Sequence, residues 1–179
     1  VYIARSFDLN EVAEYWENVI KINDYQKRRF SDNIISKMFN TVSGKKITFF
    51  GWAFKKDTND TRESPAIYVA DALLAEYAEI NVYDPKVSKH QIINDLNSLG
   101  TRTTQENEDL IEVFDDPYDS VKNSHAIAIL TEWDEFSSYD YSKIYKLMEK
   151  PSFVFDGRRI LDMDILEKIG FKTYKIGEK

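Results

Sequence analysis

Positive charge is concentrated in one polar segment that directly follows an apolar run. The run KITFFGWAF (46–54) has the composition of a buried strand, and the segment FKKDTNDTRES (54–64) follows it. The segment contains three cations: Lys55, Lys56 and Arg62. Ser64 and Pro65 suit a helix N-cap and a first helical position, and cations beside free backbone amides suit phosphate oxygens. The segment is therefore a candidate anion site, and a solvated charged loop is the alternative.

A second basic corner is FDGRR (155–159), at the end of a later apolar run. Gly157 permits an unusual backbone turn, and two adjacent arginines must project in different directions. One arginine suits a phosphate or a ligand carbonyl, while the other pairs with an acid such as Asp156 or Asp162. A structural role for both arginines is the alternative, although two basic corners in one sheet favour a binding role.

The remaining polar residues favour structural roles. Asp84 follows the second predicted strand, where dinucleotide-binding folds place a ribose-binding acid. Such folds also need a G-x-G-x-x-G segment, of which only Gly51 is present, so YDP predicts a turn and NAD is not expected to bind here in the usual way. His90 and His125 lie far apart without a ligand pattern, and residues 131–133 are expected to pack and cap. No metal site is predicted.

Strand and helix patterns alternate after Gly44. Apolar runs typical of buried strands occupy 46–54, 79–85, 110–114, 126–133, 153–157 and 173–177. Helical patterns occupy 65–78, 89–99, 118–123, 141–149 and 162–169. The alternation predicts an α/β fold: a Rossmann-like, doubly wound parallel sheet preceded by a long α-helix. Ligands in such folds bind outside the carboxyl ends of strands, which here means the segments after Ala53, Asp84 and Phe155.

The long helix is expected over residues 10–39. Apolar residues recur there at three- and four-residue steps: Val12, Trp16, Val19, Ile20, Phe30, Ile34 and Met38. Such a helix extends about 45 Å, beyond the width of one small domain. We expect part of its apolar stripe to form a homo-oligomer interface; packing against an upstream domain is the alternative. The predicted division is a linking and dimerisation region at 1–43 and a ligand-binding domain at 44–179.

The composition disfavours several classes of protein. A formal net charge of −7 argues against wrapping a nucleic-acid backbone. No apolar run approaches the roughly 18 residues of a membrane span, so no membrane partner is expected. The 179 residues contain no Cys, which removes disulfides and thiolate catalysis and fits a reducing compartment, so a cytoplasmic location is expected. The first residues lack an initiator Met and a signal-peptide layout, and we expect a fragment of a longer protein.

Five segments, in this order, resemble the UDP-glucose 6-dehydrogenase family. The stretch at 10–30 is similar to the family's long central helix, which links two Rossmann-like halves and forms the dimer core. The other four match its C-terminal UDP-binding domain: KKDTNDTRES (55–64), YDPKV (83–87), ILTEW (129–133) and FDGRR (155–159). The double arginine and the KKDT opening look more like the eukaryotic type than the bacterial one.

The resemblance implies an enzyme that oxidises C6 of UDP-glucose twice, consumes two NAD⁺ and yields UDP-glucuronate. It implies that Phe54, Lys55 and Arg158 contact the nucleotide sugar and that Arg62 reaches the NAD pyrophosphate, with Arg159 structural. The family's nucleophilic Cys and its glycine-rich NAD loop are expected upstream, so NAD is bound mainly by an N-terminal domain that this chain lacks. The chain therefore has no catalytic residue of its own and is expected to be inactive alone.

Three alternatives stay open beside this interpretation. The ligand can be another nucleotide sugar, such as GDP-mannose or an N-acetylated UDP-sugar. The chain can be an assembly module whose main property is dimerisation through residues 10–39. It can also be a regulator that senses UDP-sugars without catalysis.

Overall fold

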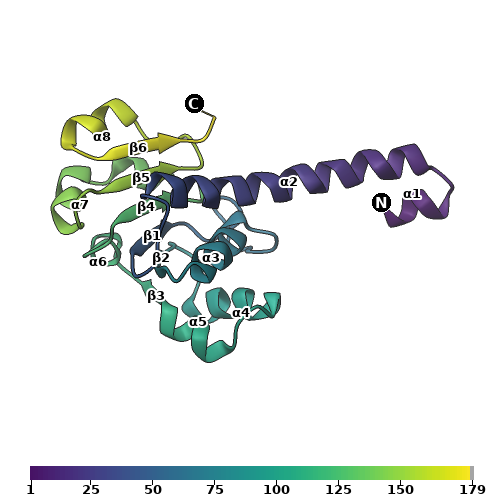
Figure 1. Cartoon of the computed structure of the whole chain (residues 1–179), viewed down its shortest axis with the longest axis horizontal. Helices are drawn as coiled ribbons and strands as arrows, with labels where there is room; N and C mark the ends of the chain where they lie inside the picture. The colour runs from purple at the N-terminus through teal and green to yellow at the C-terminus, as the bar shows by residue number, and fades with distance from the viewer. Residues whose placement is uncertain (178–179) are drawn as a thin grey trace.

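The computed structural model describes residues 1–177, and in them one long helix extends away from a six-stranded parallel sheet (Figure 1). The strands are β1 (Lys46–Phe50), β2 (Glu79–Tyr83), β3 (Ile111–Phe114), β4 (Ala126–Ile129), β5 (Phe153–Asp156) and β6 (Lys172–Lys175). Their order is β3-β2-β1-β4-β5-β6, and all neighbours are parallel. This order is that of the doubly wound Rossmann arrangement, which confirms the predicted fold class.

Helices connect these strands and cover the sheet (Figure 1). The helices are α1 (Tyr2–Ser6), α2 (Asn10–Lys37), α3 (Pro65–Ala75), α4 (Lys89–Leu99), α5 (Thr104–Leu110), α6 (Pro117–Ser120), α7 (Tyr141–Leu147) and α8 (Met163–Ile169), with a 3₁₀ helix η1 at Asp134–Ser138. Helix α5 was not predicted, because its sequence TQENEDL is polar and lacks an apolar period. A capping box defines it instead: the Thr103 hydroxyl accepts from the Glu106 N–H, and the Glu106 carboxylate accepts from the Thr103 N–H.

Two predicted strands, 46–54 and 126–133, end earlier than their apolar runs, at Phe50 and Ile129. β1 ends at Phe50, because Gly51 adopts a left-handed conformation (φ +94°) and turns the chain. A Cβ on Gly51 would lie 2.4 Å from the Thr131 side chain, so only glycine fits between these two loops. Trp52 and Ala53 remain fully buried in the turn. The apolar run therefore continues past the strand because the loop after β1 is itself part of the core.

The core lies on both faces of the central strands. Phe49 and Phe50 are consecutive in β1 and point to opposite faces, and both are fully buried. Their neighbours in β4, Ala128 and Ile129, are fully buried as well. Burial on both faces explains why these strands read as continuous apolar runs without alternation.

Helix α2 differs between its two ends. Its C-terminal part packs on the sheet domain, where Ser31 and Ile34 are buried and α3 lies alongside. Its N-terminal part extends beyond the sheet, with α1 folded back against it (Figure 1). Large apolar side chains are exposed there: Val12, Tyr15, Trp16, Ile20, Ile22 and Tyr25. In residues 1–177 no helix, α2 included, combines the length and apolar character that crossing a bilayer requires.

Candidate functional site

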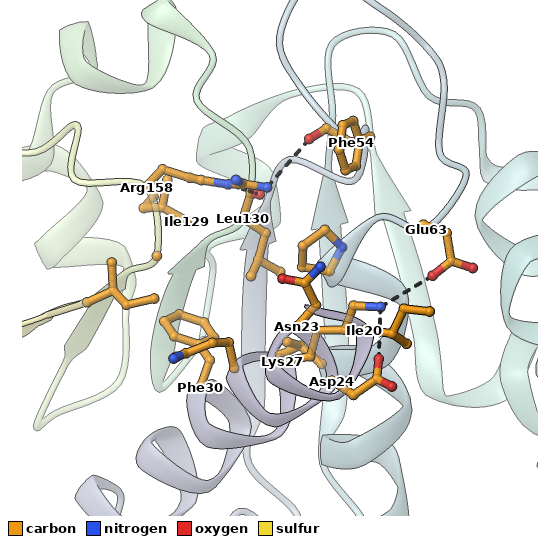
Figure 2. A pocket seen from close by; sticks show the side chains of 15 residues that line it. Ile20, Asn23, Asp24, Lys27, Phe30, Phe54, Glu63, Ile129, Leu130 and Arg158 are labelled. Carbon is orange, nitrogen blue, oxygen red and sulfur yellow. Dashed lines mark hydrogen bonds and ion pairs between the residues drawn. The ribbon is translucent and has the colours of Figure 1, made fainter. Parts of the chain in front are cut away.

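A pocket of about 490 Å³ lies at the carboxyl edge of the sheet (Figure 2). Segments far apart in sequence line it: α2, the loop 54–64 with the start of α3, and the loops that follow β4 and β5. Its volume is within the roughly 300–1,000 Å³ typical of small-molecule sites. The pocket occupies the edge that strand order alone predicts for a ligand, and two of the three predicted loops border it.

Arg158 lines this pocket, and its side chain points toward Phe54 (Figure 2). Its Nε donates to the Leu130 carbonyl at 2.6 Å, and one Nη donates to the Phe54 carbonyl at 3.5 Å. Its Nε also lies 3.4 Å from a carboxylate oxygen of Glu132. The guanidinium thus connects the loop after β5 to the loops after β4 and β1. The expected side-chain pair between the second arginine and an acid such as Asp156 or Asp162 is not found among the described residues. The Arg159 side chain contacts the Ile176 carbonyl at 3.4 Å, and the acid Glu132 lies beside Arg158 instead.

The Asp156 carboxylate fixes the FDGRR corner through the backbone. The residue is fully buried, and its oxygens accept from the N–H groups of Arg158 (2.8 Å), Arg159 (2.7 Å) and Leu161 (2.9 Å). Gly157 is needed for space, because a Cβ there would lie 2.9 Å from the Ile129 carbonyl oxygen. The left-handed residue is Arg159 (φ +60°), against the expectation for Gly157. Backbone bonds to one carboxylate therefore determine where Arg158 points.

Phe54 and Lys55 are adjacent but lie differently with respect to the pocket. The Phe54 side chain is 48% exposed and lines the pocket, and its N–H donates to the Asp60 carbonyl at 2.8 Å. Lys55 is exposed and is not among the pocket-lining residues of the described chain. The structure therefore brings Phe54 and Arg158 together, whereas Lys55 stays on the outer side of the loop. The binding roles of all three remain predictions.

Arg62 lies on the surface of the same loop and is paired with Asp60. Its Nε and Nη2 donate to the two Asp60 oxygens at 2.9 and 2.7 Å, while its own side chain is 88% exposed. These hydrogen bonds from Arg62 lower the pKa of Asp60 to about 2 and raise the pKa of Arg62. Arg62 must therefore leave Asp60 before it can bind another anion with the same face.

Two further lysines hold the ends of the loop. Lys56 Nζ lies 2.8 and 2.9 Å from the Asp134 oxygens, and this bond raises the pKa of Lys56. At the other end, Lys27 on α2 donates to Glu63 at 3.3 Å (Figure 2). Its Nζ also lies 3.6 Å from the centre of the Tyr68 ring. These contacts link the loop to η1 on one side and to α2 on the other.

The contact of Lys27 with the pocket is not predicted by the apolar stripe of residues 10–39, because Lys27 is not part of that stripe. A signal was present: Asn23, Lys27 and Phe30 are spaced four and three residues apart and so share one helix face. All three line the pocket. Burial and a hydrogen bond to Glu63 raise the pKa of the neighbouring Tyr68 to about 12, so its hydroxyl stays protonated and donates to Glu63.

The weaker candidates have structural partners. His125 Nδ1 accepts from the Lys46 N–H at 3.2 Å, and His90 lies on exposed α4 beside Asn94. The Thr131 hydroxyl donates to the Ala53 carbonyl at 2.6 Å. Within residues 1–177, no three His, Cys, Asp or Glu side chains are grouped so that they could hold a metal ion.

Fold and site together define a Rossmann-like domain whose pocket is bordered by basic loops at the carboxyl edge of a parallel sheet. A family model described as the UDP-glucose/GDP-mannose dehydrogenase family, UDP binding domain, matches residues 48–163. The chain belongs to this family and contains its UDP binding domain.

Individual relatives extend the similarity over the whole chain. UDP-glucose 6-dehydrogenase of Caenorhabditis elegans is 52% identical over 99% of this chain and 36% of that protein. UDP-glucose 6-dehydrogenase 3 of Oryza sativa subsp. japonica is 51% identical over 99% of this chain and 39% of that protein. The solved UDP-glucose dehydrogenase of Pyrobaculum islandicum has a TM-score of 0.66 at 21% identity, over 96% of this chain and 35% of that one, and shows the shared fold. The chain thus spans little more than a third of these relatives' length.

Proposed function

We propose that this chain is the nucleotide-sugar-binding part of a UDP-glucose 6-dehydrogenase. In that reaction the C6 alcohol of UDP-glucose becomes the carboxylate of UDP-glucuronate, a four-electron oxidation that needs two NAD⁺. We assign the catalytic Cys and the NAD-binding domain to a part of the enzyme outside this sequence, because the 179 residues include no Cys. Residues 44–179 then form the UDP-sugar-binding domain, and residues 1–43 link it to the other half.

The observation that carries this proposal is the meeting of Phe54 and Arg158 at one pocket. An arginine guanidinium has five N–H groups in a planar fork. Among the described residues, Arg158 uses one for Leu130 and one for Phe54, which leaves others for the oxygens of a diphosphate. Phe30 and Ile129 give the pocket apolar walls, which suit the faces of a base or a sugar ring.

The remaining roles follow the family pattern. Phe54, Lys55 and Arg158 bind the nucleotide sugar, and Arg62 binds the NAD pyrophosphate that the other domain presents. Lys55 and Arg62 both lie on the exposed side of the loop, where a second domain has access to them. Their contribution therefore depends on closure of the complete enzyme around its ligands.

Calorimetric titration of the chain with UDP and with GDP tests the substrate class. We expect UDP to bind about tenfold tighter or more, because a guanine in a site built for uracil leaves polar groups unpaired. Equal or tighter binding of GDP contradicts the assignment to UDP-sugars. Titration with UDP-N-acetylglucosamine tests the alternative that the ligand is an N-acetylated UDP-sugar. If it is, the site must accommodate the extra acetamide without loss of affinity.

We also propose that α2 forms a homo-oligomer interface. Val12, Tyr15 and Trp16 are large apolar residues exposed on the part of α2 that extends beyond the sheet domain, and a group of exposed apolar side chains favours an interaction site. Sedimentation at micromolar concentration is expected to show a dimer that Trp16→Ala weakens. Ile165→Ala, at a similarly exposed apolar residue on α8, is the matched control and leaves the dimer intact. A monomeric wild-type chain contradicts the proposal.

A further inference from the structure

Asp84 lies directly after β2, is only 8% exposed, and joins three loops through its carboxylate. Five N–H groups donate to it: Trp52 N (2.7 Å), Ala53 N (3.0 Å) and Trp133 Nε1 (3.3 Å) to Oδ2, and Lys86 N (2.9 Å) and Val87 N (3.0 Å) to Oδ1. A carboxylate has about four lone-pair sites. Both oxygens are therefore fully engaged inside the protein.

These donors come from positions that bind a dinucleotide in related folds. In a dinucleotide-binding Rossmann domain, the turn after the first strand offers its backbone to the pyrophosphate, and an acid after the second strand binds the ribose. Here the turn after β1 offers the N–H groups of Trp52 and Ala53, and the acid after β2 is Asp84. The two ligand-binding elements of such a fold are thus bonded to each other.

We propose that Asp84 is a positioning residue: its carboxylate takes the place of an external anion at the turn after β1, closes that turn to dinucleotides, and sets the direction of Phe54. The inference rests on the proposed function in one respect, namely that Phe54 and Arg158 bind the nucleotide sugar. It adds a residue outside the pocket, because Asp84 touches the turn and not the pocket itself.

The turn between Gly51 and Phe54 is held from both sides. Asp84 accepts its N–H groups, and the Thr131 hydroxyl donates to the Ala53 carbonyl at 2.6 Å. The next carbonyl, that of Phe54, is the one that Arg158 approaches at 3.5 Å. Loss of the Asp84 bonds therefore frees the peptide groups that immediately precede the ligand-facing residue.

Asp84→Asn is the sharpest variant because it keeps the size of the side chain and changes its hydrogen bonding. One oxygen becomes an NH₂ group, which cannot accept, so at least two N–H donors lose their partner in either orientation of the amide. Asp95→Asn is the matched control. Asp95 accepts from the Trp52 indole at 2.9 Å and does not touch the backbone of the turn.

Hydrogen exchange read by mass spectrometry on the full chain tests the clamp directly. In the wild type, the Trp52 and Ala53 amides are expected to exchange slowly, although they lie outside the strand ladder. In Asp84→Asn, exchange is expected to accelerate about tenfold or more over the pair of amides that faces the NH₂ group, either 52–53 or 86–87, because water reaches the freed amides. Asp95→Asn is expected to leave 51–54 unchanged, and all variants are expected to leave 153–161 protected.

Fast exchange of the Trp52 and Ala53 amides in the wild type overturns the inference without any variant. The inference can therefore be tested even if Asp84→Asn fails to fold. Unchanged exchange at both 52–53 and 86–87 in a folded Asp84→Asn also overturns it, because either orientation of the amide leaves one of these pairs without its acceptor. UDP titration of the same variants adds the second readout: Asp84→Asn is expected to weaken UDP binding roughly fivefold to tenfold, since Phe54 must be ordered by the ligand. Faster exchange with unchanged UDP affinity shows that Asp84 holds the turn without positioning the site.

The two proposals fail differently. If the wild-type chain shows no UDP binding while its Trp52 and Ala53 amides behave as expected, the nucleotide-sugar function is wrong and the clamp stands. If UDP binds but the exchange result is negative, the function stands and Asp84 has no positioning role.

Discussion

The two basic loops of the pocket are held in place by different forces. The FDGRR corner is fixed from within: the buried Asp156 carboxylate accepts three backbone N–H groups, and Arg158 donates to a carbonyl of the next loop. After its first turn, the loop 54–64 is held mainly by contacts with other segments of the chain. Its side-chain ties to other segments are ion pairs at the surface, those of Lys56 with Asp134 and of Glu63 with Lys27.

This difference divides the pocket into a fixed side and an adjustable side. Buried bonds to a charged acceptor are costly to lose, whereas exposed ion pairs contribute little and are weakened by salt. The Arg158 side chain is therefore already oriented when a ligand binds. Little conformational entropy is then lost when it forms hydrogen bonds with that ligand. Arg62 can exchange Asp60 for another anion, and the exposed Lys55 side chain can reorient, at small cost when a ligand or a second domain arrives.

The largest expected effect comes from removing the internal acceptor of the fixed corner. In Asp156→Ala one buried and two part-buried N–H groups lose their partner, so the free energy of unfolding should fall by about 3 kcal/mol. For a chain of this size that lowers the melting temperature by roughly 6–12 °C. Urea denaturation followed by circular dichroism gives both the midpoint and the slope.

Two further variants, Asp156→Asn and Asp134→Ala, should show smaller losses of stability than Asp156→Ala. Asn keeps one oxygen, and the two N–H groups that share Oδ1 can still donate to it, so the loss should be about a third as large. Asp134→Ala removes the external tie of the other loop and should leave the midpoint unchanged. A midpoint for Asp156→Ala equal to that of Asp134→Ala would remove the distinction between the two loops.

Much of the fold could be predicted from the sequence, because strands that are buried on both faces appear as continuous apolar runs. The runs at 46–54 and 126–133 predicted the central strands, and Ser64 followed by Pro65 predicted the start of α3, which the structure confirms. The carboxyl-end rule then pointed to three segments, and two of them, after Ala53 and after Phe155, border the pocket. These inferences needed only local residue types and a general property of parallel sheets.

The internal organisation of the site was not accessible in the same way. Asp156 and Asp84 each follow or end an apolar strand, and nothing local shows whether such an acid faces a ligand, an arginine or backbone amides. That choice depends on which N–H groups the tertiary fold leaves without a partner. Lys27 lies 27 residues before Phe54 in the chain, and its contact with the loop follows from the angle at which α2 packs.

The next effect in size is on ligand binding, where the two sides should respond unequally. Arg158→Ala should weaken UDP binding by about 2–3 kcal/mol, because a preset charged donor is lost. Lys55→Ala should weaken it by about 1 kcal/mol, since the flexible exposed side chain must be ordered first. Calorimetry on the chain, and Michaelis constants for UDP-glucose in the complete enzyme, measure both.

Arg159→Ala is the matched control for this pair. Arg159 is adjacent to Arg158, is exposed, and contacts the Ile176 carbonyl at 3.4 Å rather than the pocket, so UDP affinity should not change. Unchanged affinity and turnover in Lys55→Ala show that the loop 54–64 was assigned wrongly. An equal loss for Arg158 and Lys55 shows instead that the loop is as well ordered as the FDGRR corner.

The smallest expected effect tests the adjustable side by pH. Asp60 has a folded pKa of about 2 against 3.8 for an unperturbed group, mainly because Arg62 donates to it, so the stabilising pair is present above pH 3.8 and is lost as the pH falls towards 2. Since the pair is exposed, the unfolding midpoint should hardly move over this range on its account. NMR titration of the Asp60 carboxyl should give a midpoint near 2 in the wild type and a higher one in Arg62→Ala, where only the backbone N–H of residue 62 still donates to it. A midpoint that stays low without Arg62 would mean that the fold itself stabilises the Asp60 charge, and Arg62 would then be free for a pyrophosphate at no electrostatic cost to the loop.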